Sequence, residues 1–480
     1  MGGSDSAGYA NTARDLVAGR IVVPVEAPAR LGLDDGWSRV FIPLAEYPGA
    51  RAGTMVPYYP PGFPLHVALV SLVAGWTKGP LLVSPLFAIA ALVLTYLLAR
   101  ELTLSRAFSL AAGALLAGCS VFIAHAIWPI SDIAATTWCT AAILGALRAR
   151  RTTGWAGWAA LSGASFGLAV LIRPADALLL LPLALALPWR RTAWVPFVLA
   201  GSPFALFYGF WNQTAYGSPF RTGYAGQLAT ELSASYFAAR AGRYGWWILI
   251  QFSPLVPLGW AGMAVDRRVP VRDRALLLSW FASFFVFHCL WMSAAADWTF
   301  GRYLLPAAPA LLIGFLLALR DALRHLPEGG FLAIGRRVGV PYRAAAATVI
   351  VGALLFVERR VERRLRPLRY TSGDAVYPEG CRRLQALAPD GKALVVGMEF
   401  SAAVRYYTRL TPVRWDLLSP DAFAVLRARA AANGYRILGA VLPHEANRAA
   451  SAAPGEWRFI ENVGLASLWE LPPPGERARP

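Results

Sequence analysis

Long apolar stretches recur along this 480-residue chain, separated by short loops rich in arginine. A helix needs about 17 to 25 predominantly apolar residues to cross the roughly 30 Å hydrocarbon core of a bilayer. About ten apolar stretches match or approach that length, several of them being short, at 80–99, 106–124, 132–147, 155–172, 174–189, 193–211, 246–264, 275–293, 303–319 and 344–358. The pattern predicts an all-α polytopic membrane bundle.

The composition agrees with a membrane protein. Hydrophobic residues make up 56% of the chain and charged residues only 15%, far from the balance of an ordinary soluble domain. The chain has 18 Trp and 17 Tyr, many of them at the ends of apolar stretches, where such rings favour the headgroup layer. The four cysteines show no CxxC pair and no metal-ligand spacing, so neither a disulfide framework nor a zinc site is expected.

The net charge of +18 comes from arginine, since lysine occurs only at Lys78 and Lys392. A basic chain can bind nucleic acid, but these arginines lie in short loops between apolar stretches, as in cytoplasmic loops. They concentrate in alternate loops, at 100–106, 148–151, 190–191, 266–274 and 320–343. These loops are therefore predicted inside, and the first 60 residues and the region after about 360 outside.

One apolar segment, at 63–76, does not fit this alternation. It is too short to cross, and a crossing there would invert the arginine asymmetry of every later loop. We therefore expect an interfacial or re-entrant helix on the outer face. No apolar helix precedes the outer segment, so we also expect the natural start to lie upstream and to add one crossing, giving about eleven.

The sequence thus predicts four regions. Residues 1–62 form an outer catalytic loop and residues 63–358 the transmembrane domain. Residues 371–471 have the composition of a small soluble α/β domain, with strand-like runs at 393–398, 435–442 and 465–471. The proline-rich tail at 472–480 is expected to be disordered.

Ionisable residues at the outer ends of apolar helices are candidates for function, because they are costly there. Asp5 and Asp132 also have a plain explanation as helix caps, and Arg173 and Arg302 as arginines that reach lipid phosphate. Taken together, however, outer carboxylates and arginines on different helices would bind an anionic lipid-linked donor. A carboxylate beside a hydroxyl or amine would accept its proton.

Several short motifs lie in this order along the chain: the opening Asp5 loop with Tyr9, the run from Tyr58 to Pro64, Ser131-Asp132, Leu171 to Pro174, Tyr216 to Pro219, and Gly301 to Pro306. Over residues 1–320 this set resembles the membrane glycosyltransferases of the GT-C fold, in the protein mannosyltransferase and aminoarabinose transferase (glycosyltransferase family 39-like) superfamily.

The resemblance implies transfer of a sugar from a polyprenyl-phosphate donor to a lipid, glycan or protein acceptor on the outer face. It maps the general base onto Asp5 and a second acidic position onto Asp132. It also implies that Arg173 and Arg302 contact the donor phosphate. The expected substrate-binding residues are Tyr9, Tyr58, Tyr59, His66, Arg173, Arg221, Arg302 and Tyr303.

The sequence departs from these relatives in two places. Asp5 is followed by Ser6 where many relatives have Asp-Glu, and Tyr59 stands where aminoarabinose-type transferases have a lysine before the paired prolines. Substrate identity is therefore not transferred. No cofactor is predicted: a divalent metal is compatible with the carboxylates, but they are too few and too scattered to define an octahedral site.

Two other functions are compatible with many helices and outer charges. A transporter or flippase of lipid-linked sugars would show internal repeats and polar residues near the membrane midplane, whereas the charges here gather at one interface. A non-catalytic envelope assembly protein would leave the long outer loop unexplained. We therefore favour the enzyme, in a bacterial plasma membrane, with the C-terminal domain outside and helping to select the acceptor.

Overall fold

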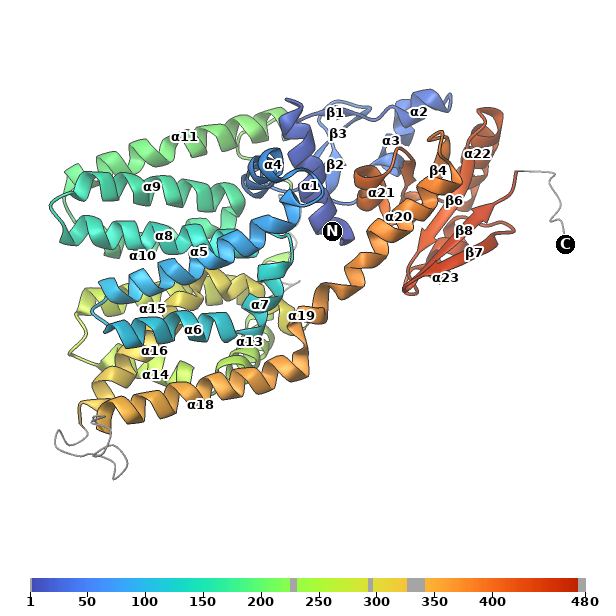
Figure 1. Cartoon of the computed structure of the whole chain (residues 1–480). Helices are drawn as coiled ribbons and strands as arrows, with labels where there is room; N and C mark the ends of the chain where they lie inside the picture. The colour runs from blue at the N-terminus through green and yellow to red at the C-terminus, as the bar shows by residue number, and fades with distance from the viewer. Residues whose placement is uncertain (1, 225–230, 292–296, 326–341, 474–480) are drawn as a thin grey trace.

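The structure, a computed structural model, describes residues 2–224, 231–291, 297–325 and 342–473. A bundle of helices carries a small α/β domain at one end (Figure 1). Residues 474–480 of the predicted tail and residues 326–341 of the predicted inner loop lie outside the described residues.

Each predicted apolar stretch corresponds to one helix or to two consecutive helices. The bundle consists of α5 Gly79–Glu101, α6 Arg106–Gly118, α7 Ser120–Ile127, α8 Asp132–Arg151, α9 Trp155–Ile172, η2 Pro174–Leu179, α10 Leu180–Ala186, α11 Arg191–Tyr216, η3 Ala234–Tyr236, α13 Phe237–Phe252, α14 Leu255–Val265, α15 Val271–Cys289, η4 Trp298–Ala307, α16 Ala308–Leu323 and α18 Tyr342–Leu365. Within the described ranges, four helical segments are long and apolar enough to cross a membrane, or up to six when each of two bent pairs counts as one span.

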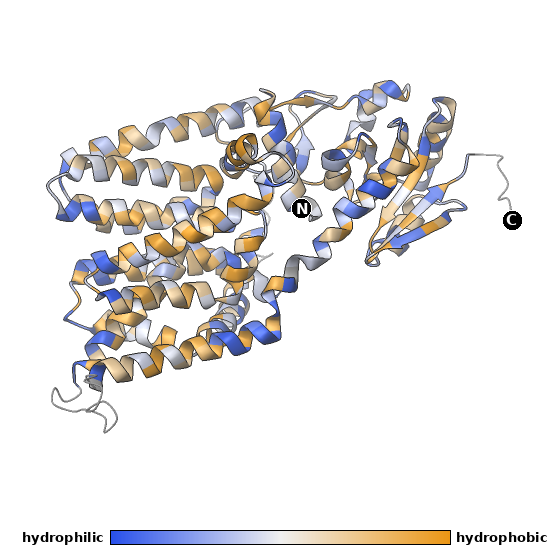
Figure 2. Ribbon diagram, viewed as in Figure 1, coloured by the Kyte–Doolittle hydropathy of each residue, from blue (hydrophilic) through white to orange (hydrophobic). Residues whose placement is uncertain are grey.

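The other bundle helices run beside these segments (Figure 1). Helix α8 is mostly buried among its neighbours, so it needs few lipid-facing apolar side chains. Threonine hydroxyls of this helix donate hydrogen bonds to backbone carbonyls one turn earlier: Thr136 donates to the carbonyl of Asp132, and Thr140 to the carbonyl of Thr136. Hydrophobic residues elsewhere cover the length of the bundle, and hydrophilic residues gather at its ends (Figure 2).

Two predicted spans are bent. The stretch at 246–264 is not one straight helix, because α13 and α14 meet at 105°. The chain turns at Ser253, whose φ of 63° lies in the left-handed region, directly before Pro254. Helices α6 and α7 meet at 68°, at Cys119, whose backbone is extended.

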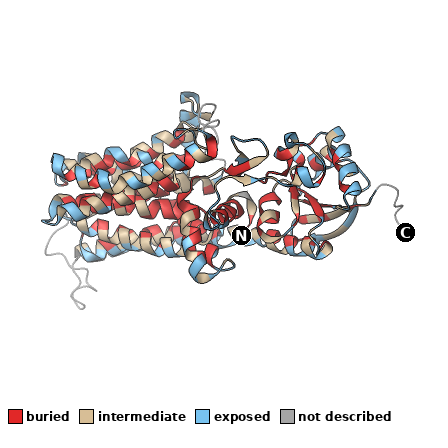
Figure 3. Cartoon of the chain, turned by 90° about the horizontal axis from the view of Figure 1, so that it is seen from above, coloured by how far each residue is buried: buried red, intermediate tan, exposed pale blue. Residues whose placement is uncertain are grey.

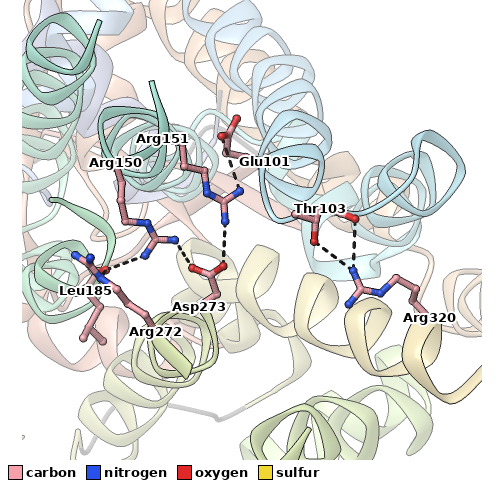
Figure 4. Close-up of polar contacts among 8 residues, drawn as sticks. All are labelled: Glu101, Thr103, Arg150, Arg151, Leu185, Arg272, Asp273 and Arg320. Carbon is pink, nitrogen blue, oxygen red and sulfur yellow. Dashed lines mark hydrogen bonds and ion pairs between the residues drawn. The ribbon is translucent and has the colours of Figure 1, made fainter. Parts of the chain in front are cut away.

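The bundle end far from the α/β domain is held together by arginines (Figure 4). Arg150 and Arg151 of α8 both pair with Asp273 of α15, the latter at 3.0 Å. Arg272 donates to the carbonyl of Leu185 at 2.6 Å, beyond which α10 ends. The arginines predicted in inner loops therefore cap and cross-link the helix ends at this side.

The C-terminal domain is an α/β unit, as predicted. Its five-stranded sheet has the order β5-β4-β6-β8-β7, with β4 parallel to β5 and β6, and β8 antiparallel to β6 and β7. Its elements are α19 Pro367–Tyr370, η5 Thr371–Ala375, α20 Val376–Leu387, β4 Ala393–Val396, α21 Ser401–Tyr407, β5 Thr411–Val413, η6 Trp415–Leu417, α22 Pro420–Ala432, β6 Arg436–Val441, α23 Ala446–Ala452, β7 Arg458–Val463 and β8 Ala466–Leu471.

The N-terminal segment lies between the bundle and this domain. It contains α1 Gly3–Val17, β1 Val23–Pro24, α2 Ala27–Arg30, η1 Asp35–Trp37, α3 Ser38–Phe41, β2 Glu46–Pro48, β3 Thr54–Pro57 and α4 Gly62–Ala74. The three strands form a small antiparallel sheet. Leu31, Val40 and Phe41 are buried in one hydrophobic core with Val413 and Phe423 of the C-terminal domain. Figure 3 shows buried residues continuing from the bundle into this junction.

Helix α4 corresponds to the segment at 63–76 that was predicted to be interfacial or re-entrant. At 13 residues it is about 20 Å long, which is shorter than the hydrocarbon core of a bilayer. It packs against α1 and α5, and it is seen nearly end-on in Figure 1 where most bundle helices run across the view. The helix therefore lies across the end of the bundle that faces the C-terminal domain.

Candidate active site

Asp5 lies inside the first turn of α1, which begins at Gly3 and has no side-chain cap. The cap explanation therefore does not apply to Asp5. Its Oδ1 accepts a hydrogen bond of 2.5 Å from the Tyr59 hydroxyl. Burial, and next the negative charge of Asp5, raise the pKa of Tyr59 well above its usual value, so the phenol stays protonated and donates. Asp5 is half-buried and faces the junction between bundle and C-terminal domain.

Aromatic rings surround this carboxylate. The Tyr9 ring lies 4.5 Å from that of Tyr59, and the Tyr58 ring packs edge-on against Tyr59 at 5.1 Å. Tyr224, which the sequence analysis did not single out, adds a ring 5.2 Å from Tyr58. The loop that carries Tyr224 can come this close because Gly223 has no side chain. A Cβ at Gly223 would lie 2.1 Å from the Tyr58 carbonyl oxygen. The predicted residues Tyr9, Tyr58 and Tyr59 thus form one cluster with Asp5.

Asp132 and Arg173 neutralise one another. Arg173 Nη2 lies 2.8 Å from Asp132 Oδ1, and its Nε donates to Ser131 Oγ at 3.2 Å. The same serine hydroxyl accepts a hydrogen bond from the Tyr9 hydroxyl. Asp132 begins α8 and is buried, whereas a cap would be the preceding residue, Ser131. The two sequence candidates therefore meet, and Asp132 is engaged before any substrate arrives.

Arg302 is held differently. Its guanidinium packs over the Tyr303 ring at 5.1 Å and donates to the Tyr303 hydroxyl at 3.4 Å. It interacts electrostatically with both Asp132 and Asp5. Its Nε is buried and has no hydrogen-bond partner among the described residues. A permanent cation with a donor left over is suited to an incoming anion.

The Tyr303 ring, over which Arg302 packs, is stacked with two further aromatic rings. His288 lies parallel to Tyr303 at 5.1 Å, and Trp291 lies 6.1 Å from Tyr303. The Trp291 indole donates to Glu231 of the outer loop. Arg173 also faces the Tyr303 ring, at 5.5 Å. Tyr303 thus lies between the two arginines assigned to donor binding.

Two predicted residues are placed apart from this group. His66 makes two contacts with its ring nitrogens: Nδ1 lies 2.6 Å from the Gly62 carbonyl oxygen, and Nε2 accepts from the Trp138 indole at 3.2 Å. This pattern requires the neutral tautomer with the proton on Nδ1. Arg221 is exposed in the loop after α11, and its backbone amide donates to Ser218.

An apolar cavity lies beside η4. It has a volume of about 30 Å³ and is lined by residues that include Val121, Tyr244, Gln251, Gly301 and Leu304. Gln251 Oε1 accepts from the Val121 amide at 3.2 Å and from Cys119 Sγ at 3.1 Å. The cavity lining includes Gly301, the chain neighbour of Arg302, but not Arg302 itself.

Among the residues that the structure describes, no group of three His, Cys, Asp or Glu side chains is placed to hold a metal ion. Asp5 and Asp132 are both present at the site, but the second is paired with Arg173. The polar groups gathered here are the Asp5 carboxylate, tyrosine hydroxyls and the guanidinium groups of Arg173 and Arg302.

Comparison with solved structures identifies the fold. The crystal structure of ArnT from Cupriavidus metallidurans bound to undecaprenyl phosphate matches 98% of this chain and 94% of its own length, with a TM-score of 0.60 and 14% identity. The archaeal oligosaccharyltransferase AglB from Archaeoglobus fulgidus, in complex with an inhibitory peptide and a dolichol phosphate, matches 97% of this chain and 70% of its own length, with a TM-score of 0.55 and 12% identity. The chain has the GT-C fold.

The GT-C fold confirms the architecture expected from the sequence, a helical membrane bundle with a small C-terminal α/β domain. No protein-family model and no curated protein sequence matches the chain. Within the GT-C fold of this chain, the polar cluster lies where α1, the start of α8, the end of α9 and η4 meet.

Proposed function

We propose that this protein is an integral membrane glycosyltransferase that moves a sugar from a polyprenyl-phosphate-linked donor to a lipid, glycan or protein acceptor. One observation carries the proposal: a half-buried carboxylate, Asp5, lies in a GT-C fold within electrostatic range of Arg302, whose buried Nε has no hydrogen-bond partner among the described residues. The undecaprenyl phosphate bound by ArnT and the dolichol phosphate bound by AglB support a lipid-linked donor.

Asp5 is the better base of the two carboxylates. Asp132 is buried and its charge is already balanced by Arg173 at 2.8 Å, so it holds Arg173 in place. Asp5 accepts from the neutral Tyr59 hydroxyl, which orients the carboxylate. A carboxylate can take the proton of an acceptor O–H or N–H.

The reaction follows from these roles. Asp5 takes the proton from the acceptor hydroxyl or amine while the acceptor atom forms a bond to the anomeric carbon of the sugar. The bond between that carbon and the phosphate oxygen breaks, and its electron pair leaves with the polyprenyl phosphate. Arg302 and the Asp132-anchored Arg173 stabilise the negative charge on the leaving phosphate.

The proposed site faces outward. The short arginine-rich loops at 148–151 and 266–274 lie at the end of the bundle opposite the C-terminal domain (Figure 1), and such loops remain on the cytoplasmic side of membrane proteins. This asymmetry supports a C-terminal domain and an Asp5 on the extracytoplasmic face of a bacterial plasma membrane.

Sugar transfer in membranes tests the proposal. A strain lacking the gene is complemented with wild type, Asp5→Asn or Asp421→Asn. Membranes from each strain are then incubated with labelled lipid-linked sugars. Label is then followed into lipid, glycan and protein fractions. Loss of the base is expected to lower transfer by roughly 10²- to 10⁴-fold. Asp421 is an exposed acidic residue at the start of α22, so its variant should match wild type.

The outcomes separate the alternatives. Transfer by wild type and Asp421→Asn but not by Asp5→Asn supports the base, and the labelled fraction gives the acceptor class. Equal transfer by Asp5→Asn refutes the role of Asp5 and makes Asp132 the next candidate. No transfer by any variant, together with movement of intact donor across the membrane, would instead support a flippase.

We also propose that transfer needs no metal, because a paired Asp132 leaves too few carboxylates for an octahedral site. Activity is expected to be unchanged by EDTA. Activity that disappears with EDTA and returns with Mg²⁺ or Mn²⁺ would contradict this.

A further inference from the structure

The helix that carries Asp5 is clamped between two different cores. Tyr9 and Ala13 of α1 are buried with Phe63 of α4 on the bundle side. Ala7 is buried in the core of the C-terminal domain, with Val404 and Leu410. Because residues three or four apart share a helix face, one face of α1 belongs to the bundle and the other to the C-terminal domain.

The second face of α1 is joined by polar contacts to one short helix, α21. Asn11 Nδ2 donates to the carbonyl of Ala402 at 3.0 Å. Arg14 Nη1 donates to the carbonyl of Tyr406 at 2.6 Å, and its guanidinium packs 3.7 Å above the centre of that ring. Tyr406 in turn donates its hydroxyl to the carbonyl of Trp76, directly after α4. Helix α21 therefore reaches both α1 and the α4 region.

Arg405 joins three segments at the centre of this contact. Its Nη2 lies 2.6 Å from Asp15 Oδ2 of α1, and its Nη1 lies 2.5 Å from Glu46 Oε1 of β2. The Arg405 side chain is 17% exposed, and the two carboxylates are almost fully buried. The planar, forked guanidinium is pre-organised to place one hydrogen bond on each of two carboxylates.

The contact of Arg405 with Asp15 and Glu46, called the Arg405 node below, fixes the relative position of three segments more than it adds to the free energy of unfolding. A buried ion pair must repay the desolvation of its charges, so replacing it by apolar residues is often neutral, but it fixes the relative position of the segments that it joins. Asp5 and Asp15 lie about 15 Å apart along α1, and the helix between them is continuous. A shift or rotation imposed at Asp15 is therefore transmitted to Asp5.

We propose that Arg405 of the C-terminal domain is a positioning residue for Asp5: by bridging Asp15 and Glu46 it sets the rotation and axial position of α1 against the bundle. This inference rests on the proposed function, in which Asp5 is the base. The C-terminal domain then acts on the chemical step itself, in addition to any part in acceptor choice.

The first test compares Arg405→Met, Arg405→Lys and Arg414→Met in purified protein. Arg414 is a matched control, because it is 16% exposed and its side chain pairs with Asp416 in the same domain. A displacement of about 1 Å at a reacting group costs on the order of 10²-fold in rate. Arg405→Met is expected to lower kcat by roughly 10- to 100-fold with the donor KM within about twofold. Arg405→Lys should recover part of kcat, and Arg414→Met should match wild type.

Hydrogen exchange gives a readout that does not depend on activity. In Arg405→Met the backbone amides of α1 should exchange faster than in wild type, while those of α5 and α9 stay unchanged. Unchanged exchange in α1, with unchanged kcat, overturns the proposal. An equal loss of kcat in Arg414→Met also overturns it, because the effect would then be a general consequence of weakening the domain.

A milder variant covers the case in which Arg405→Met does not fold. Asp15→Asn keeps the Arg405–Glu46 pair and removes one link, and the same split between kcat and donor KM is expected. Wild type without transferase activity would refute the proposed function, while faster exchange of α1 in the Arg405 variant would still support the positioning of this helix.

Discussion

At the scale of single residues, the Asp132–Arg173 pair connects stability to the donor site. Removing one partner leaves the other buried and unpaired, which typically costs about 3–5 kcal/mol. Asp132→Asn is therefore expected to lower the thermal unfolding temperature clearly, and the double variant Asp132→Asn/Arg173→Met to recover part of the loss. Glu379→Gln, which breaks the exposed pair with Arg382, should change the free energy of unfolding by less than about 1 kcal/mol. If Asp132→Asn and Glu379→Gln lowered the free energy of unfolding equally, the Asp132–Arg173 pair would not behave as a buried pair.

Glu46 predicts a pH dependence of stability. Burial raises the pKa of Glu46 to about 7, although the charge of Arg405 opposes the shift. The folded state then binds this proton more tightly than the unfolded state. The free energy of unfolding therefore falls as pH rises from about 4.5 to about 7, by on the order of 3 kcal/mol for this one group.

Glu46→Gln removes that contribution. The unfolding temperatures of wild type and Glu46→Gln, measured in detergent between pH 5 and pH 8, should diverge with rising pH, with wild type losing more. Asp374 and Glu399, whose pKa values burial also raises, are present in both proteins, so the difference isolates Glu46. Parallel curves for the two proteins would show that Glu46 is ionised throughout the range.

At the scale of elements, the start of α4 approaches the end of α9 as closely as backbones allow. A Cβ at Gly62 would lie 2.5 Å from the carbonyl carbon of Leu171 and 2.5 Å from the amide nitrogen of Ile172. Backbone atoms cannot turn aside as a side chain does, so α4 must shift. Since Arg173 directly follows this contact, the shift reaches the donor site.

Gly62→Ala is therefore expected to destabilise the protein by about 1–3 kcal/mol and to lower transferase activity. Gly242→Ala is the control, because nothing lies within 4 Å of a Cβ at that position of α13, and alanine favours a helix over glycine by about 1 kcal/mol. Thermal unfolding and transfer assays on both variants check this. A Gly62→Ala protein as stable and active as Gly242→Ala would show that the two helices can separate at no cost.

At the scale of the whole molecule, the N-terminal segment and the C-terminal domain share a core. Leu31, Val40 and Phe41 are buried against C-terminal residues, and the Arg414 amide donates to the Val40 carbonyl at 2.8 Å. A chain that ends at Arg366 would leave these apolar residues in water. The truncated protein is therefore expected to lose sugar transfer to every acceptor, where a domain that served only acceptor choice would leave some transfer.

Limited trypsin digestion of the truncated chain checks the physical reason. Cleavage at Arg30 and Arg39 should become much faster than in the full chain, because the segment between them no longer packs on a core. Full resistance at these sites, or retained transfer with relaxed acceptor choice, would show that residues 1–62 fold on the bundle alone.

The sequence by itself determined the class of the molecule. Apolar length is a local property, and it located the main helices of the bundle, although within the described residues only four segments, or up to six with the bent pairs, are long and apolar enough to cross a membrane. The outer carboxylates and arginines were also visible, since Asp132, Arg173 and Arg302 lie at the ends of apolar stretches and Asp5 lies in the polar segment that precedes them. The bends at Cys119 and Ser253 were not predicted, because an apolar stretch has the same hydropathy whether its helix is straight or broken.

Only the tertiary structure decided what these residues do to one another. Asp132 and Arg173 were both candidates for chemistry, yet their pairing places one of them in a supporting role. The Arg405 node had no signal in the sequence, because Arg405, Asp15 and Glu46 are ordinary charged residues until packing buries them together. The shared core of residues 31–41 and the C-terminal domain joins segments more than 350 positions apart. Contacts between segments so distant in the chain leave no local periodicity, so they arise only when the chain is folded.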